Sequence, residues 1–257
     1  MLKLLLFILF YCYSTYSGAS DEQRELDYAE QIQSSFSTGE IVWLQVKGKK
    51  FLTLYTETEE IENLGTIIVL PPMDGHPDQS KLINPLRSYF PEHGWATLSL
   101  QLPVLGVEAA EDEYYPLFDN AKARIQAAID YLLAAKAKNI VLVGYGLGGM
   151  MAVYYIKENA NKTEIKGLVT ISLSVPKSDQ KQVQVINFID DIKQPFYDIF
   201  AEFDLPEVTE SARKRRIAAK ENPAYRQFKI AGEGHLFQRD QGLLVKRIYS
   251  WISRTFR

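Results

Sequence analysis

A glycine-rich turn between an apolar run and a helical pattern constrains the fold of this chain more than any other segment. Residues 140–143 are apolar and mostly β-branched, which is typical of a buried strand. Gly144, Gly146 and Gly149 follow, and residues 148–158 have the composition of a helix. Where such strand–turn–helix units repeat along a chain, they are typical of a sheet of parallel strands, because parallel strands need crossover connections.

The rest of the chain repeats this alternation. The other segments expected to be strands are residues 41–46, 51–55, 66–70, 95–102, 168–173, 196–201 and 227–231, and amphipathic patterns predict helices over residues 82–90, 118–132 and 244–256. The sequence therefore predicts an α/β fold with a mostly parallel twisted sheet and helices on both faces. The turn Lys47-Gly48-Lys49-Lys50 predicts an antiparallel N-terminal hairpin at one edge.

Two known motifs fit the glycine-rich turn. Gly144, Gly146 and Gly149 satisfy G-x-G-x-x-G, the dinucleotide-binding fingerprint. That motif occupies the first strand–helix turn of its fold and needs an acidic residue about 20 positions later. Here four expected strands come first, and residues 171–174 contain no acid. We therefore expect no dinucleotide and no other cofactor.

The second motif is the nucleophile elbow G-x-S-x-G, with Gly146 where serine would stand. In enzymes with this elbow an acid and then a histidine follow in chain order, each on a loop after a later strand. Asp204 follows the expected strand 196–201, and His235 follows strand 227–231 and a glycine-rich turn. We expect Asp204 and His235 to converge near the backbone of Gly146.

With these motifs, the chain resembles the α/β-hydrolase superfamily from about residue 41 to the C-terminus. More narrowly, Pro85-Leu86-Arg87, residues 94–103 and residues 144–148 resemble an uncharacterised bacterial family within it. The resemblance implies the fold and a location in the bacterial envelope, but no substrate. It also places Gly146 at the nucleophile position, Asp204 and His235 at the acid and base positions, and loop 71–76 at the oxyanion hole.

Glycine at the elbow changes the expected chemistry. Acyl transfer on this fold needs a hydroxyl, thiol or carboxylate there, and losing the nucleophile of a catalytic triad costs on the order of 10⁶ in kcat. Ser172 and Ser174 are the alternative hydroxyls, but they end the neighbouring strand, too far sideways for easy attack.

Two functional hypotheses follow. The first is a non-catalytic binding or structural component of the envelope. The alternative is a non-covalent hydrolase or lyase that uses a His235–Asp204 base dyad. An intact, enclosed pocket at Gly146 and His235 favours the enzyme, whereas a filled pocket with an exposed apolar patch favours the binding module.

The loop after residue 70 could also contribute to a metal site. Asp74, His76, Asp78 and His235 could form a ligand set, and His76 is expected to face the same site. Their spacing is generic, and glycine–proline loops are usually turns, so we expect no metal.

Two charged segments flank the expected site. Residues 108–116 form an acidic loop with aromatic residues at its end, which could be a lid, a partner surface or a solvated loop. Arg213, Lys214, Arg215 and Arg216 predict a basic helix that either is solvated or contacts envelope proteins or an anionic surface. The formal net charge of −3 argues against a globally basic nucleic-acid-binding protein.

The N-terminus predicts export. Lys3 precedes an apolar run over residues 4–13, and Ser17-Gly18-Ala19 resembles a signal-peptidase site. We therefore expect residues 1–19 to be a signal peptide that is cleaved near Ala19. The protein would then be periplasmic or otherwise exported. An uncleaved anchor is the alternative, although the run is shorter than the ~20 residues of a spanning helix. Cys12, the only cysteine, would leave with this segment. Residues 20–40 are read as a lead-in and residues 41–257 as one α/β-hydrolase-like domain with no transmembrane span.

Overall fold

The computed structural model describes residues 20–161 and 164–256. The expected signal peptide lies outside the described residues. The elements in chain order are α1 (Glu22–Ser35), β1 (Glu40–Val46), β2 (Lys49–Thr56), β3 (Gly65–Leu70), α2 (Ile83–Tyr89), η1 (Pro91–His93), β4 (Trp95–Leu100), η2 (Glu111–Leu117), α3 (Phe118–Ala134), β5 (Ile140–Tyr145), α4 (Leu147–Glu158), β6 (Ile165–Ile171), η3 (Lys181–Val183), α5 (Val185–Asp191), β7 (Phe196–Phe203), α6 (Pro206–Thr209), α7 (Ala212–Ala218), η4 (Ala219–Glu221), β8 (Tyr225–Gly234) and α8 (Gln241–Phe256).

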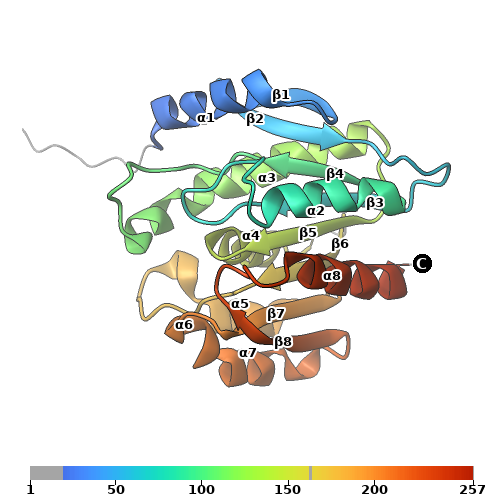
Figure 1. Ribbon diagram of the computed structural model, residues 1–257. Coiled ribbons are helices and arrows are strands. Elements are labelled where there is room, and N and C mark those ends of the chain that lie inside the picture. Colours follow the sequence, from blue (N-terminus) through green and yellow to red (C-terminus); the bar gives the residue numbers. More distant parts are fainter. Residues whose placement is uncertain (1–19, 162–163, 257) are drawn as a thin grey trace, which may run out of the picture.

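The strands form one eight-stranded sheet in the order β1-β2-β4-β3-β5-β6-β7-β8 (Figure 1). The pairs β1–β2 and β2–β4 are antiparallel, and β4–β3, β3–β5, β5–β6, β6–β7 and β7–β8 are parallel. The fold is thus the α/β-hydrolase type, and the antiparallel hairpin β1–β2 lies at one edge, as the sequence predicts.

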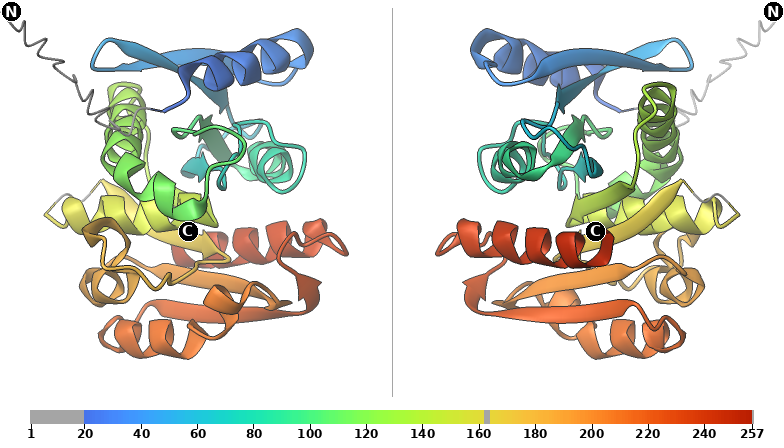
Figure 2. Two further views of the ribbon diagram at one scale, coloured as in Figure 1. Left: turned by 90° about the vertical axis from the view of Figure 1, so that its left-hand side faces the viewer. Right: turned by 90° about the vertical axis from the view of Figure 1, so that its right-hand side faces the viewer.

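Helices cover both faces of the sheet. Helices α3, α4 and α5 pack on one face around a core that includes Leu98, Leu142 and Leu168, whereas α2 and α8 pack on the other around Ile67, Val143 and Ile199 (Figure 2). The central strands β3, β4 and β5 are buried along their whole length, which explains their nearly continuous apolar runs.

The lead-in, residues 20–40, contains helix α1. Asp21 caps α1, because its side chain accepts a hydrogen bond from the backbone N–H of Arg24. Ala29 and Ile32 of this helix are buried against Leu52 and Leu54 of β2. None of the helices within the described residues is long and apolar enough to cross a membrane.

Candidate functional site

The turn between β5 and α4 has a backbone conformation that favours glycine. Gly146 has φ 53° and ψ −120°, and it directly precedes Leu147, the first residue of α4. Gly148 allows the start of α4 to pack closely against the loop after β3. A Cβ atom at this position would lie 2.3 Å from the carbonyl oxygen of Pro71. The segment therefore keeps a sharp strand–turn–helix geometry although it carries no nucleophile.

His235 and Asp204 lie together beside this turn. Asp204 follows β7 and His235 follows β8, two neighbouring parallel strands whose carboxyl ends meet at one edge of the sheet. The Nδ1 atom of His235 lies 2.6 Å from Oδ1 of Asp204. The Asp204 side chain is fully buried, whereas 28% of the His235 side chain is exposed. Because Nδ1 is engaged by Asp204, Nε2 is the ring nitrogen left to meet a ligand.

Asp204 is held by several donors. The backbone N–H groups of Ala201 and Leu205 donate to its carboxylate at 3.0 and 2.9 Å. Burial by itself raises the pKa of this carboxyl, but hydrogen bonds from His235, Ser172 and these two N–H groups outweigh it and lower the pKa below the ordinary value. Asp204 is thus an ionised group that can orient and stabilise the imidazole.

Tyr145 fixes the loop that carries the histidine. Its hydroxyl donates to the carbonyl oxygen of His235 at 2.9 Å, and the two rings lie 5.4 Å apart. Tyr145 is the residue just before Gly146, so this bond joins the elbow directly to the His235 loop. Burial, with a smaller contribution from the charge on Asp204, raises the pKa of Tyr145 above its ordinary value and keeps the phenol a donor.

Ser172 is a site residue whose role sequence reasoning missed. It follows β6, is buried, has a positive φ of 53°, and its hydroxyl donates to Oδ2 of Asp204 at 2.5 Å. As its proton is directed to the carboxylate and not to His235, the bond does not activate Ser172 as a nucleophile. Ser174, the other candidate, donates to the sulfur of Met150. The position of Ser172 at the end of the strand between the elbow and the acid is the signal that could have indicated its role.

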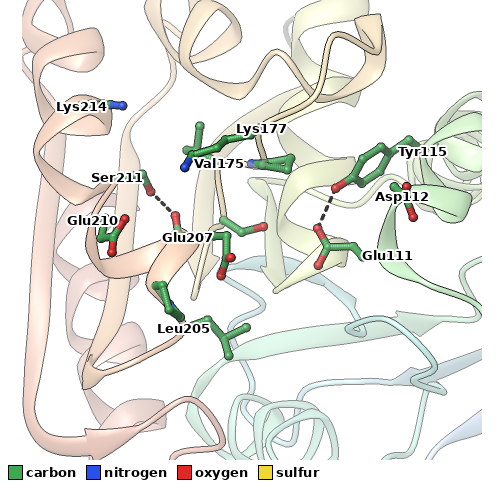
Figure 3. A pocket seen from close by; sticks show the side chains of 13 residues that line it. Glu111, Asp112, Tyr115, Val175, Lys177, Leu205, Glu207, Glu210, Ser211 and Lys214 are labelled. Carbon is green, nitrogen blue, oxygen red and sulfur yellow. Dashed lines mark hydrogen bonds between the residues drawn. The ribbon is translucent and has the colours of Figure 1, made fainter.

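A cavity of about 240 Å³ opens over the elbow. Its lining combines polar groups with a largely apolar wall: Pro72, Met73, Gln79, Lys81, Leu82, Glu111, Tyr145, Gly146, Leu147, Ser172, Ser174, Leu205, His235 and Leu236. A second cavity of about 650 Å³ shares Glu111, Ser174 and Leu205 with it and extends to Lys177 and Lys214 (Figure 3). The site is therefore open and continues into a neighbouring depression.

The loop at residues 71–76 is held by the lead-in helix and by η2. Asp74 accepts hydrogen bonds from Arg24 of α1 at 2.6 Å and from Tyr114 of η2 at 2.5 Å. Asp74 has a positive φ of 59°, and the hydroxyl of Tyr28 donates to its carbonyl oxygen. These three bonds stabilise a backbone conformation that a non-glycine residue rarely adopts.

The side chains of the possible metal-ligand set have other partners. Asp74 pairs with Arg24, and Asp78 pairs with the buried Arg87 at 2.9 Å. The ring of His76 lies 5.1 Å from that of Tyr28, and His76 does not line the cavity over Gly146, contrary to expectation. Within residues 20–161 and 164–256 there is no group of three His, Cys, Asp or Glu side chains placed to hold a metal ion.

One residue of the basic run lies in the core and not on the surface. Arg215, expected on a basic surface, is fully buried, and its guanidinium forms an ion pair with the buried Asp198 of β7 at 2.8 Å. It faces the core because α7 packs on the sheet, and a charge buried in β7 needs a partner. Arg213, Lys214 and Arg216 remain exposed.

The acidic loop is also partly buried. Tyr114 and Tyr115 of η2 are buried, and Glu111 lines both cavities. This segment forms part of the wall of the site and is not simply a solvated loop.

Comparison with known proteins identifies the family of the chain. The family described as "Protein of unknown function (DUF3530)" matches residues 15–114 and 108–254. The chain belongs to the DUF3530 family. No protein of curated function matches this DUF3530 protein.

Solved structures share its fold at low sequence identity. Est1E from Butyrivibrio proteoclasticus is 16% identical with a TM-score of 0.64, and the match covers 84% of this chain and 98% of that one. The Pyrococcus furiosus esterase Pf2001 is 16% identical with a TM-score of 0.69, covering 85% and 93%. A serine hydrolase without a lid from Xanthomonas campestris is 14% identical with a TM-score of 0.66, covering 85% and 95%. At these identities the likeness shows the α/β-hydrolase fold.

Proposed function

We propose that this DUF3530 protein binds a small acyl compound over Gly146 and hydrolyses it without a covalent intermediate. The observation that supports the proposal is the 2.6 Å His235–Asp204 contact beside an open cavity that also reaches Gly146. Binding alone would not need a buried, ionised carboxylate that orients the His235 ring. This ranking reverses the one drawn from the sequence, where the non-catalytic module came first.

In this mechanism Gly146 leaves room for water where serine hydrolases place their hydroxyl. His235, oriented by Asp204, takes a proton from that water through Nε2 as the oxygen attacks the acyl carbon. The backbone N–H groups of the turn into α4 and of loop 71–76 are the donors available to the developing oxyanion. The structural similarity to the Pyrococcus furiosus esterase Pf2001 supports an ester as the substrate class.

The test is hydrolysis of a panel of esters by the purified protein. We expect turnover that His235→Gln lowers by about 10²–10⁴, since this is the usual contribution of general-base catalysis. A fluorophosphonate probe should not label the protein, because Gly146 offers no hydroxyl. His235→Gln protein purified in the same way controls for contaminating esterases. Equal rates for wild type and variant would overturn the proposal.

The second candidate is binding without turnover. Leu205 and Leu236 line the cavity and are 43% and 48% exposed, and Phe203, close to Asp204 in the chain, is 69% exposed. An exposed apolar rim of this kind also fits a protein or ligand contact. If the ester panel shows no turnover while ligand fragments still bind at His235, this candidate replaces the first.

We also propose that the protein works after export to the periplasm. Lys3, the apolar run of residues 4–13 and the small residues before Ser20 support cleavage near Ala19. The exposed Arg213, Lys214 and Arg216 support a contact with an anionic surface or an envelope protein. N-terminal sequencing of the protein from cell fractions tests the first point.

A further inference from the structure

Glu111 occupies a distinctive place in the site. It is the first residue of η2, and it lines both the cavity over Gly146 and the larger neighbouring cavity. The hydroxyl of Tyr115 donates to Oε1 of Glu111 at 3.0 Å and holds the carboxyl group at the cavity wall (Figure 3). Glu111 and His235 therefore reach the same cavity from distant segments of the chain.

We propose that Glu111 is the general acid of the hydrolysis in which His235 is the general base, an assignment that rests on the proposed function. The base and the acid would then be separate groups on one cavity. In a serine hydrolase the histidine performs both tasks in turn, because it recovers the proton that it took from the nucleophile. A direct attack by water forms no covalent enzyme intermediate. With a separate acid, the proton transfer from water to His235 and the proton transfer to the leaving oxygen can both take place in a single stage of the reaction.

The surroundings of Glu111 suit this role. Its burial raises the pKa of its carboxyl, and the negative charges of Glu207 and Asp112 act in the same direction. The Tyr115 hydrogen bond and the nearby His235 act in the opposite direction, but the net shift is upward. Glu111 thus keeps its proton to higher pH than an ordinary glutamate, whereas Asp204 is held ionised. The opposite shifts fit two different roles, since Glu111 has to hold a proton that it can donate, whereas Asp204 has to stay ionised beside His235, the base.

In the hydrolysis of an ester, every proton that moves has a donor and an acceptor. His235 Nε2 takes one proton from water while the oxygen of that water forms a bond to the acyl carbon. The tetrahedral intermediate then collapses, the bond from carbon to the alkoxy oxygen breaks, and the leaving oxygen takes the proton of Glu111. The products are a carboxylic acid and an alcohol. Proton transfer from imidazolium to the Glu111 carboxylate, directly or through solvent, restores the starting state.

The experiment compares leaving groups. For one acyl group, hydrolysis of the p-nitrophenyl ester and of the ethyl ester is measured with wild type, Glu111→Gln and Glu210→Gln. A nitrophenolate departs without a proton, whereas an ethoxide needs one. We expect Glu111→Gln to lower kcat/KM for the ethyl ester by about 10²–10⁴ and for the p-nitrophenyl ester by less than about tenfold. Glu210, which lines only the neighbouring cavity, is the matched control and should change neither rate.

The outcomes separate the two proposals. Equal losses on both esters, or no loss, would show that Glu111 is not the acid, while the His235 mechanism would stand. If wild type and His235→Gln hydrolyse neither ester measurably, the proposed function itself fails and the role of Glu111 fails with it. Circular dichroism of Glu111→Gln confirms that a rate change does not come from unfolding.

Discussion

Ser172 donates a 2.5 Å hydrogen bond to Oδ2 of Asp204, the oxygen that His235 does not use. Both carboxylate oxygens are therefore engaged, with the backbone N–H groups of Ala201 and Leu205 adding one bond to each. This arrangement fixes the carboxylate and the imidazole in one orientation beside Gly146. Such a network explains how the histidine can remain oriented although the covalent nucleophile is missing.

The first prediction concerns the pH dependence of folding. The folded-state pKa of Asp204 is lowered, so this group stabilises the protein above its unfolded pKa, about 3.9, and the stabilisation is lost as the pH falls through the lower folded value. We expect the difference in free energy of unfolding between wild type and Asp204→Asn to be constant from pH 7 to about 5 and to shrink below about pH 4. Urea denaturation at a series of pH values measures it. A difference that grows on acidification would contradict the assignment.

The second prediction concerns the elbow. A Cβ atom on Gly146 would lie 3.6 Å from the Cβ of Pro72, an ordinary contact, so Gly146→Ser fits in space. Its positive φ should cost about 1–3 kcal/mol in stability. We expect a fluorophosphonate probe to label Gly146→Ser but neither wild type nor Gly146→Ala, which carries the same backbone strain without the hydroxyl. Labelling of Gly146→Ala would show that another residue is the reactive nucleophile.

The third prediction concerns the close approach of α4 to β3. Gly148→Ala would place a Cβ atom 2.3 Å from the carbonyl oxygen of Pro71, so the loop or the helix must move. We expect a loss of about 1–3 kcal/mol, the usual cost of overpacking. Gly106→Ala is the matched control, because a Cβ atom there meets nothing within 4 Å. Thermal denaturation of the two variants gives the comparison, and equal melting temperatures would refute the packing argument.

The sequence predicts the site geometry better than it predicts the partners of individual side chains. Gly146, Asp204 and His235 could be placed because each follows a strand, and the ends of parallel strands meet at one edge of the sheet. The Ser172–Asp204 bond depends on β6 lying beside β7, a neighbour relation that periodicity does not reveal. The hydrogen bond from the Tyr145 hydroxyl to the carbonyl oxygen of His235 depends in the same way on where the loop after β8 lies, which periodicity also does not reveal.

Arg215 illustrates a different limit. In a run of four basic residues, nothing local distinguishes the buried one from its exposed neighbours. The available signal lies elsewhere, at Asp198, because an acid within the apolar run of β7 requires a buried partner. Only the packing of α7 on the sheet determines that Arg215 supplies it.

The last prediction tests this buried network. The carboxylate of Asp198 accepts bonds from Arg215, Tyr225 and Gln227 at 2.8–2.9 Å, and both members of the ion pair are fully buried. Arg215→Met removes the only positive charge among these partners and leaves a buried carboxylate uncompensated, which costs about 3–5 kcal/mol. The exposed Arg213→Met, two residues away on the same helix, should change the free energy of unfolding by less than about 0.5 kcal/mol. Chemical denaturation of both variants measures the contrast. Similar stabilities for the two would mean that Arg215 does not support the core in the way its ion pair indicates.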